Sequence, residues 1–287
     1  MSSEWKSYQL ADLAKFKYGK FLAKSQLDES GFPVFSGYGV VGYLPTFQFD
    51  EPQLLIVCRG EGGTGDVKMS PRKCSITNLS IVFSPNEQIV SKKYLYWALK
   101  ASDTHRLRTG SAQAQIVIGS LEKLWLSIPT DKSEQDAIAH TLDALDDRIT
   151  LLRETNATLE AIAQAMFKSW FVDFDPVHAN AKGRAPEGMS EATAALFPDS
   201  FEESELGLVP RGWQIRKAET LLTRLKTKVR YTKEQVSFSG ATPVYEQGVG
   251  ILLGYHENSA QFAATPNEPI FIFGDHTCVT HLSCAPC

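Results

Sequence analysis

One segment carries the side chains expected of a surface that reads DNA bases. Residues 106–115 read Arg-Leu-Arg-Thr-Gly-Ser-Ala-Gln-Ala-Gln and precede a strand-like run at 124–129. Glutamine can bond an adenine edge bidentately, and arginine can bond guanine or a backbone phosphate. A polar loop without any partner would have the same composition. We predict DNA contacts by five side chains of this segment, namely Arg106, Arg108, Ser111, Gln113 and Gln115.

A glycine-rich segment supplies a second, weaker set of candidates. Residues 60–65 follow a strand-like run, as phosphate-binding loops do, but they lack the Gly-Lys-Ser/Thr ending that contacts nucleotide phosphates and metal. We interpret the segment as a β-turn or an exposed loop. The basic residues that flank it are candidate DNA contacts, and they are Arg59, Lys68, Arg72 and Lys73.

The sequence contains no constellation typical of catalysis. It has neither an H-E-x-x-H nor a G-x-S-x-G motif. Histidines and cysteines do gather within residues 276–287, but all lie in one short strip. Because a structural zinc site takes its ligands from separated elements, we expect no metal in this strip. Since the catalytic motifs are also missing, we expect no catalytic residue in the chain.

Charge is distributed unevenly, so the formal net charge of −4 does not exclude DNA. Residues 1–130 carry 15 lysines and arginines against 11 acidic residues, and residues 213–287 carry 7 against 6. Residues 131–212 carry 7 against 16. The last segment opens with a dense run of lysines and arginines over 213–235. Such a run can bind phosphates, or it can be a solvent-exposed face without a partner.

The two outer segments share a series of features in the same order. A tryptophan and a basic stretch precede Pro33-Val34, and the same arrangement precedes Pro243-Val244. A Glu-Pro pair and a four-residue apolar run then follow, at 54–57 and again at 270–273. Chance similarity of β-rich segments is the alternative. We expect two copies of one β-rich unit, because short aromatic and β-branched runs bounded by Gly, Pro and Asn are typical of strands.

A long helix is expected between the two copies. Ten positions from 138 to 170, nearly all of them apolar, are spaced alternately four and three residues apart, as in a heptad repeat. They form one stripe, called the seam here, along about 50 Å of helix. Ser133 is the predicted N-cap. No other segment of the chain offers a matching heptad series. The seam positions, expected to pack against a partner helix, are Ile138, Leu142, Leu145, Ile149, Leu152, Asn156, Leu159, Ala163, Met166 and Trp170.

These patterns predict an α+β chain in four parts. A β-rich domain spans 1–130, the helix 131–175, a linker 176–212 with a short helix near 190–197, and the partial second β-rich copy 213–287. No apolar run is long enough to span a membrane, and the N-terminus lacks a signal-peptide pattern. We therefore expect a cytoplasmic protein without membrane contact, whose five cysteines are reduced.

Several motifs together resemble the specificity subunit of type I restriction-modification enzymes. The resemblance begins at the junction formed by Gly110-Ser111-Ala112-Gln113, Ile128-Pro129 and Glu134-Gln135. It continues through the run 167–177 after the helix, and through Gly207-Leu208-Val209-Pro210-Arg211-Gly212-Trp213, which in the family opens a second recognition domain. The resemblance covers nearly the whole chain.

The resemblance implies a non-catalytic DNA-binding role. In this family, two target-recognition domains each read half of a bipartite site in double-stranded DNA, and two conserved coiled-coil helices separate them and dock methyltransferase subunits. Adenine methylation with S-adenosylmethionine would belong to a modification subunit. ATP- and Mg-dependent translocation and cleavage would belong to a restriction subunit. No cofactor is expected in this chain itself.

The chain departs from the family pattern in its second copy. That copy reaches Cys287 before any counterpart of the 106–115 segment or of a second helix. The resemblance therefore leaves three alternatives: a fragment or truncated product, a frameshift, or a half-subunit that forms a homodimer through its heptad helix. A truncated or half subunit would act as a dimerising or regulatory protein that alters or blocks the specificity of the complex.

Overall fold

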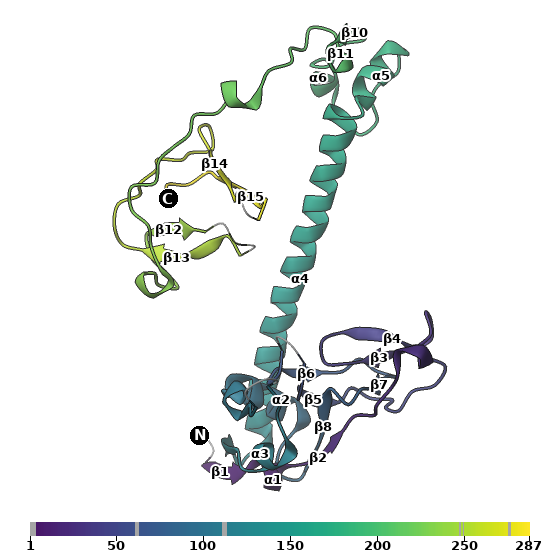
Figure 1. Ribbon diagram of the computed structural model, residues 1–287, viewed down its shortest axis with the longest axis vertical. Coiled ribbons are helices and arrows are strands. Elements are labelled where there is room, and N and C mark those ends of the chain that lie inside the picture. The colour runs from purple at the N-terminus through teal and green to yellow at the C-terminus, as the bar shows by residue number, and fades with distance from the viewer. Residues whose placement is uncertain (1–3, 61–62, 111–113, 247, 249, 275–276) are drawn as a thin grey trace. The chain divides into compact units, whose positions relative to one another are not determined.

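The computed structural model describes residues 4–60, 63–110, 114–246, 248, 250–274 and 277–287 (Figure 1). The chain divides into two compact units, Met1–Asp173 and Phe174–Cys287. The expected α+β class is confirmed, with a β-rich lobe, one long helix and a second set of strands. No helix in the described ranges is long and apolar enough to cross a membrane.

A four-stranded antiparallel sheet forms the centre of the first unit. Its order is β2 (Ala14–Tyr18), β8 (Ser80–Pro85), β5 (Leu54–Val57) and β6 (Val67–Met69). The four residues of β5 are 0% exposed. Leu54 and Ile56 join one hydrophobic cluster, whereas Leu55 joins another with Val82 and Ile76. Both faces of β5 are thus covered, which is why this strand reads as an unbroken apolar run.

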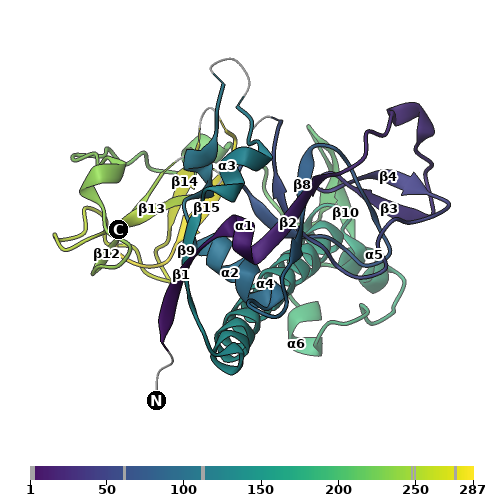
Figure 2. The same ribbon diagram turned by 90° about the horizontal axis from the view of Figure 1, so that it is seen from below.

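Helices and the chain ends of the lobe cover one face of this sheet. The helices are α1 (Leu10–Leu13), α2 (Lys92–Ala101) and α3 (Ile118–Glu122), with the 3₁₀ turn η2 (Thr104–Leu107) (Figure 2). A second 3₁₀ turn, η1 (Lys24–Gln26), precedes Leu27, which contacts the smaller sheet described next. β1 (Trp5–Gln9) pairs antiparallel with β9 (Trp125–Pro129). The predicted strand at 124–129 is therefore present, and it brings the start of the lobe beside the start of the long helix.

A smaller sheet covers the other face. β3 (Phe32–Phe35) and β4 (Val40–Leu44) form an antiparallel hairpin, and β3 also pairs in parallel with β7 (Ser75–Ile76). The register of the hairpin shifts between Val34 and Phe35. Gly42 in β4 has a φ of +154°, and a Cβ there would meet the Leu27 side chain at 2.8 Å. Only glycine fits this bend without displacing its neighbour.

The predicted long helix is α4 (Lys132–Phe171), 40 residues in a single run (Figure 1). The predicted N-cap is wrong by two residues. Asp131 occupies the N-cap position, because its carboxylate accepts hydrogen bonds from both the backbone N–H and the hydroxyl of Ser133 at 2.8 Å. The backbone hydrogen bond from Ser133 is the main cause that holds the pKa of Asp131 below its ordinary value.

The first turns of α4 are fastened to the lobe by polar side chains. The Gln135 side chain is fully buried, and its Oε1 accepts from the backbone N–H of Ser91 at 2.9 Å. Its Nε2 donates to the carbonyls of Ile89 and Pro129 at 2.9 and 2.8 Å. About two turns further along the helix, Asp143 accepts from Lys93 at 2.6 Å and from Trp97 Nε1 at 2.8 Å.

The opening part of the second unit is more ordered than the expected linker. Residues 176–212 contain most of α5 (Asp175–Ala181), then α6 (Glu191–Ala194), β10 (Phe201–Ser204) and β11 (Gly207–Pro210). The expected short helix near 190–197 is confirmed as α6, with Ser190 as its N-cap. The rings of Phe201 and Trp213 both contact the ring of Phe174, with centroid distances of 6.2 and 5.8 Å.

The rest of the second unit repeats the hairpin of the first. β12 (Thr242–Tyr245) pairs with β13 (Leu252–His256), and the register shifts between Val244 and Tyr245, the positions that match Val34 and Phe35. Gly254 repeats Gly42, with a φ of +158° and a close approach to Val236. β14 (Ile270–Phe273) pairs with β15 (Thr280–Ser283). The internal repeat predicted from the sequence is thus present in three dimensions.

Candidate nucleic-acid interface

The 106–115 segment lies beside the end of the central strand. It was predicted to be a loop, but Arg106 lies inside the 3₁₀ turn η2. The backbones of Thr109 and Gln115 exchange two hydrogen bonds of 2.8 and 2.9 Å. Gln115 also forms a β-bridge with Arg59, the second residue after β5. Ser111 and Gln113, the remaining candidates of this segment, lie outside the described residues.

The glycine-rich segment was interpreted as a β-turn or an exposed loop, and the β-turn is confirmed for residues 63–65, where the backbone N–H of Asp66 donates to the Gly63 carbonyl at 2.9 Å. The exposed-loop alternative is wrong for these residues. Gly63, Thr64 and Gly65 are buried, with Thr64 only 2% exposed. The Thr64 hydroxyl donates to the Gly60 carbonyl at 2.9 Å. The Thr104 hydroxyl donates to the Gly65 carbonyl at 2.6 Å. The turn is buried because Thr104, His105, Arg108 and Ala114 contact it.

Arg108 contacts this buried turn directly. Its Nε donates to the Thr64 carbonyl at 2.6 Å, and its Nη2 lies 2.5 Å from Nδ1 of His105. The side chain nevertheless remains exposed to solvent. The structure therefore brings three of the predicted residues together, since Arg59 and Gln115 pair through their backbones and Arg108 binds the turn between them.

Two tyrosines that sequence reasoning missed lie around Arg59. The guanidinium carbon of Arg59 is 5.7 Å from the centre of the Tyr18 ring. The Tyr38 hydroxyl donates to the Arg59 carbonyl at 3.3 Å. A Cβ on Gly60 or Gly63 would collide with the Tyr38 ring. The available signal was Gly37-Tyr38-Gly39, a tyrosine between two glycines with positive φ.

The other flanking candidates do not all join this surface. Arg72 and Lys73 follow β6, which runs antiparallel to β5 with Leu54 opposite Met69. They therefore lie at the opposite end of the strand pair from Arg59. Arg72 is also bound to Glu51, with 2.5 Å between Nη2 and Oε1. Sequence proximity to the glycines grouped these residues with Arg59, but the antiparallel pairing separates them.

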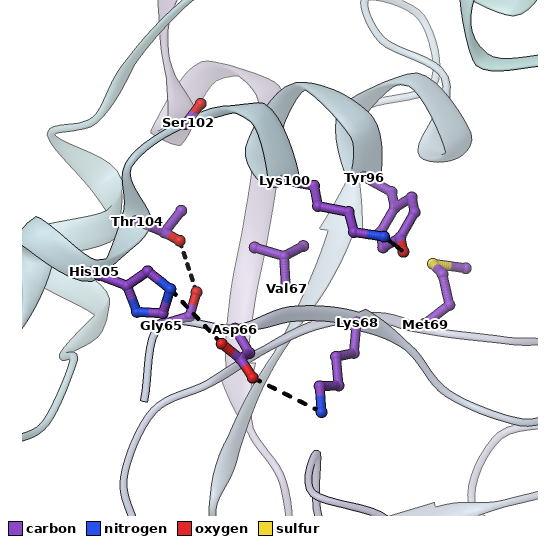
Figure 3. A pocket seen from close by; sticks show the side chains of 10 residues that line it. All are labelled: Gly65, Asp66, Val67, Lys68, Met69, Tyr96, Lys100, Ser102, Thr104 and His105. Atoms are coloured by element: carbon purple, nitrogen blue, oxygen red, sulfur yellow. Dashed lines mark hydrogen bonds and ion pairs between the residues drawn. The ribbon is translucent and has the colours of Figure 1, made fainter. Parts of the chain in front are cut away.

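Lys68 lies on the wall of a shallow cavity of about 520 Å³ beside the same turn (Figure 3). Its Nζ is 3.8 Å from Asp66, and Nε2 of His105 is 3.7 Å from the same carboxylate. Lys100, on the opposite wall, donates to the Tyr96 hydroxyl at 3.0 Å. The lining contains two lysines and one carboxylate, Asp66, which lies close to Lys68 and His105, so its charges alone select no ligand.

The heptad seam divides into a covered part and an open part. Ile138 packs against the core of the lobe, and Leu142 is partly buried. Leu145 and Leu159 are 57% and 58% exposed. Ile149, Leu152, Asn156, Ala163 and Met166 are also exposed, while Trp170 is partly buried. Most of the predicted packing face therefore lies open in this chain.

The thiols and metal-ligating groups of the described residues are spread over the chain. Burial raises the pKa of Cys58 and of Cys74, which disfavours the thiolate needed for nucleophilic chemistry. In the described ranges, no group of three or more histidine, cysteine or acidic side chains is placed to hold a metal ion. Of the C-terminal strip, Cys278, Cys284 and Cys287 are free thiols.

The described residues form a β-rich lobe that presents Arg59 and Arg108 beside a glycine-rich turn, and this lobe is fastened to one long helix. The family comparison identifies this arrangement. Residues 2–161 match the type I restriction modification DNA specificity domain, and the chain belongs to this family. The match covers the first lobe and most of α4.

Three relatives illustrate the similarity. The chain is 42% identical over 122 residues to the HindI specificity subunit of Haemophilus influenzae, covering 40% of this chain and 26% of the relative. It is 23% identical over 241 residues to the EcoDI specificity subunit of Escherichia coli, covering 79% and 52%. An S subunit structure from M. genitalium shares the fold with a TM-score of 0.57 and 19% identity, covering 99% of this chain and 70% of that one. The match thus covers about a quarter of the HindI subunit and about half of the EcoDI subunit.

Proposed function

We propose that this chain is the DNA-recognition component of a type I restriction-modification complex. The observation that carries the proposal is the specificity-domain match over 2–161, which includes the whole folded lobe and the start of the helix fastened to it. Residues 1–130 would read one part of a two-part site in double-stranded DNA. Residues 131–175 would act as the spacer, and 213–287 as a second, partial recognition unit after the 176–212 segment.

The surface around Arg59, Arg108 and Gln115 is the proposed DNA contact of the first lobe. Two arginines and a glutamine gather where β5 ends and the 106–115 segment returns. Arg106 lies one turn away in η2 and is also exposed. Arg72, Lys73 and Lys68 are secondary candidates, because the first two lie at the far end of the strand pair and Lys68 faces Asp66.

The chemistry would reside in partner subunits. A modification subunit would methylate adenine with S-adenosylmethionine, and a restriction subunit would use ATP and Mg to translocate and cut DNA. The acidic helix segment, with its open seam, is the surface proposed to hold these partners together. The chain itself would bind no cofactor.

Methylation mapping tests this proposal. The chain is expressed together with the modification subunit of its own system, and methylated adenines are mapped in the host DNA. We expect methylation at a defined two-part or symmetric sequence that disappears without the chain. Arg106→Ala and Arg108→Ala should each lower DNA affinity and reduce the salt slope by about one. Methylation that does not depend on the chain would refute the proposal.

The open seam of α4 favours a second candidate function, that of a dimerising regulator. Leu145, Ile149 and Leu152 form an exposed apolar stripe, and such stripes in long helices usually pack against another helix. A second copy of the chain would cover it and alter or block the specificity of the complex. Light scattering coupled to size exclusion, with and without the modification subunit, distinguishes a homodimer from a helix that binds only the partner.

A further inference from the structure

Arg108 is anchored along one side before any ligand arrives. A guanidinium carries five N–H donors and no acceptor. The Thr64 carbonyl takes the Nε donor at 2.6 Å, and Nδ1 of His105 lies 2.5 Å from Nη2. These contacts use two donors, so three N–H groups remain for an outside acceptor on an exposed side chain. We propose that Arg108 is a preorganised fork for paired oxygen or nitrogen acceptors on DNA, and that His105 is the positioning residue that fixes it.

The role of His105 follows from its ring nitrogens. Nδ1 faces both the Arg108 guanidinium and the Thr64 carbonyl, at 2.5 and 3.0 Å. Because arginine can only donate, the contact with Arg108 requires Nδ1 to accept and to carry no proton. The Thr64 carbonyl then takes its hydrogen bond from Nε of Arg108 and not from the ring. The ring proton lies on Nε2, on the side that faces Asp66, whose Oδ1 is 3.7 Å away (Figure 3). The ring thus holds Arg108 through Nδ1.

The glycine-rich turn supplies the floor of this arrangement. Gly65 has a φ of +103°, and a Cβ there would lie 2.6 Å from Nδ1 of His105 and 3.1 Å from its Cα. The Gly65 carbonyl also accepts from the Thr104 hydroxyl, which ties the turn to the start of η2 (Figure 3). The glycine-rich turn at 63–65 therefore holds His105 and Arg108 in place and does not have the ending of a phosphate-binding loop.

Preorganisation matters because a free arginine loses rotamer freedom when it binds. An arginine already held on one side keeps its planar fork aligned, and lysine cannot replace such a fork. The fork fits two ligand groups on DNA, namely the oxygens of one phosphate or O6 and N7 of one guanine. This inference rests on the proposed DNA-recognition function, and it adds which residue fixes the contact.

A double-mutant cycle in the full chain tests the inference. His105→Ala, Arg108→Ala and the double variant are measured, with the modification subunit, on fluorescein-labelled duplexes carrying either the mapped site or a mixed sequence. We expect Arg108→Ala to weaken binding about tenfold and His105→Ala about threefold. The double variant should bind no more weakly than Arg108→Ala alone. Equal losses from His105→Ala with and without Arg108 would overturn the proposal, as would no loss at all.

Two further variants separate positioning from folding. His105→Gln keeps an acceptor for Arg108 and should recover most of the lost affinity, whereas failure to recover any would count against the proposal. Lys123→Ala removes the same charge from an exposed position on the chain and should leave the affinity within about twofold.

The same measurements identify the DNA group that Arg108 binds. They also distinguish a failure of the proposed function from a failure of the role given to His105. A phosphate contact predicts equal losses on both duplexes and a salt slope reduced by about one. A guanine contact predicts a loss confined to the mapped site. If the wild-type chain bound neither duplex, the proposed function would fail; if it bound and the cycle were additive, only the role of His105 would fail.

Discussion

The two β-rich copies share a hairpin but differ in what surrounds it. In the first copy, β5 lies between β6 and β8, and its four residues are 0% exposed. In the second, β14 pairs only with β15 among the described residues, and Phe271 and Phe273 are half exposed. The same sequence pattern thus gives a buried central strand in one copy and an open-edged strand in the other.

The basic stretch shows the same difference. In the first copy, Lys15 and Lys17 lie on β2, which is held by β8. In the second copy, residues 222–232 form no helix or strand. A strand needs a neighbour for its backbone groups, so the hairpin forms locally while the β2-like strand depends on a distant partner. Local pairing and long-range pairing can therefore be compared within one chain.

The largest expected difference in stability comes from replacing one large side chain by alanine in each of the two strands, β5 and β14. Leu55→Ala removes a fully buried side chain from β5 and should cost about 3 kcal/mol. Phe271→Ala, at the matching position of β14, should cost less than about 1 kcal/mol because the ring is already half exposed. Hydrogen exchange read by mass spectrometry over 54–57 and 270–273 measures each effect locally. Equal losses of protection would show that β14 is covered in solution.

Two glutamines offer the next comparison, at the level of single side chains. Gln135 is buried and joins three backbone groups of the lobe, whereas Gln261 makes similar contacts to Lys228 and Val229 at an exposed site. Gln135→Ala leaves buried polar groups unsatisfied and should cost about 2 kcal/mol. Gln261→Ala should cost less than about 0.5 kcal/mol, since water replaces the amide. Urea midpoints at an unchanged slope test the ranking, which a larger effect at Gln261 would reverse.

Much of this arrangement could be predicted from local patterns. The heptad spacing predicts α4, and the repeated Pro-Val pairs and apolar runs predict that both outer copies are β-rich. The N-cap was misassigned because Ser133 and Asp131 both have capping side chains, and the choice depends on where the chain leaves β9. α2 was missed, although Ser91 is its N-cap.

The candidate site was only partly predictable because long-range pairing builds it. Residue type identified Arg59, Arg108 and Gln115, but the β-bridge that joins Arg59 to Gln115 spans distant parts of the sequence. Likewise, no local signal places Arg72 at the opposite strand end from Arg59. Burial of Thr64 follows from a covering segment some 40 residues away in the chain.

The smallest expected effect concerns acid sensitivity, and it compares a carboxylate that links two elements with one that is only local. Burial favours the neutral form of Asp143, but hydrogen bonds from Lys93 and Trp97 outweigh it and hold the pKa of this carboxyl below its ordinary value. The stabilisation is therefore present above about pH 4 and is lost as the pH falls through the lowered pKa. Glu234 also has a lowered pKa, mainly because of a hydrogen bond with Thr232 in the same turn.

Asp143→Asn should thus cost about 1 kcal/mol at pH 7, a modest value because the Lys93 side chain is largely exposed. The gap between Asp143→Asn and wild type should begin to close below about pH 4 and should narrow further as the pH falls through the lowered pKa of the wild-type carboxyl. Glu234→Gln should change the exchange of its own turn and leave protection of 92–101 and 132–143 unaltered. A gap at Asp143 that stays constant from pH 7 to 3 would mean that packing of Trp97, and not the charge, joins α2 to α4.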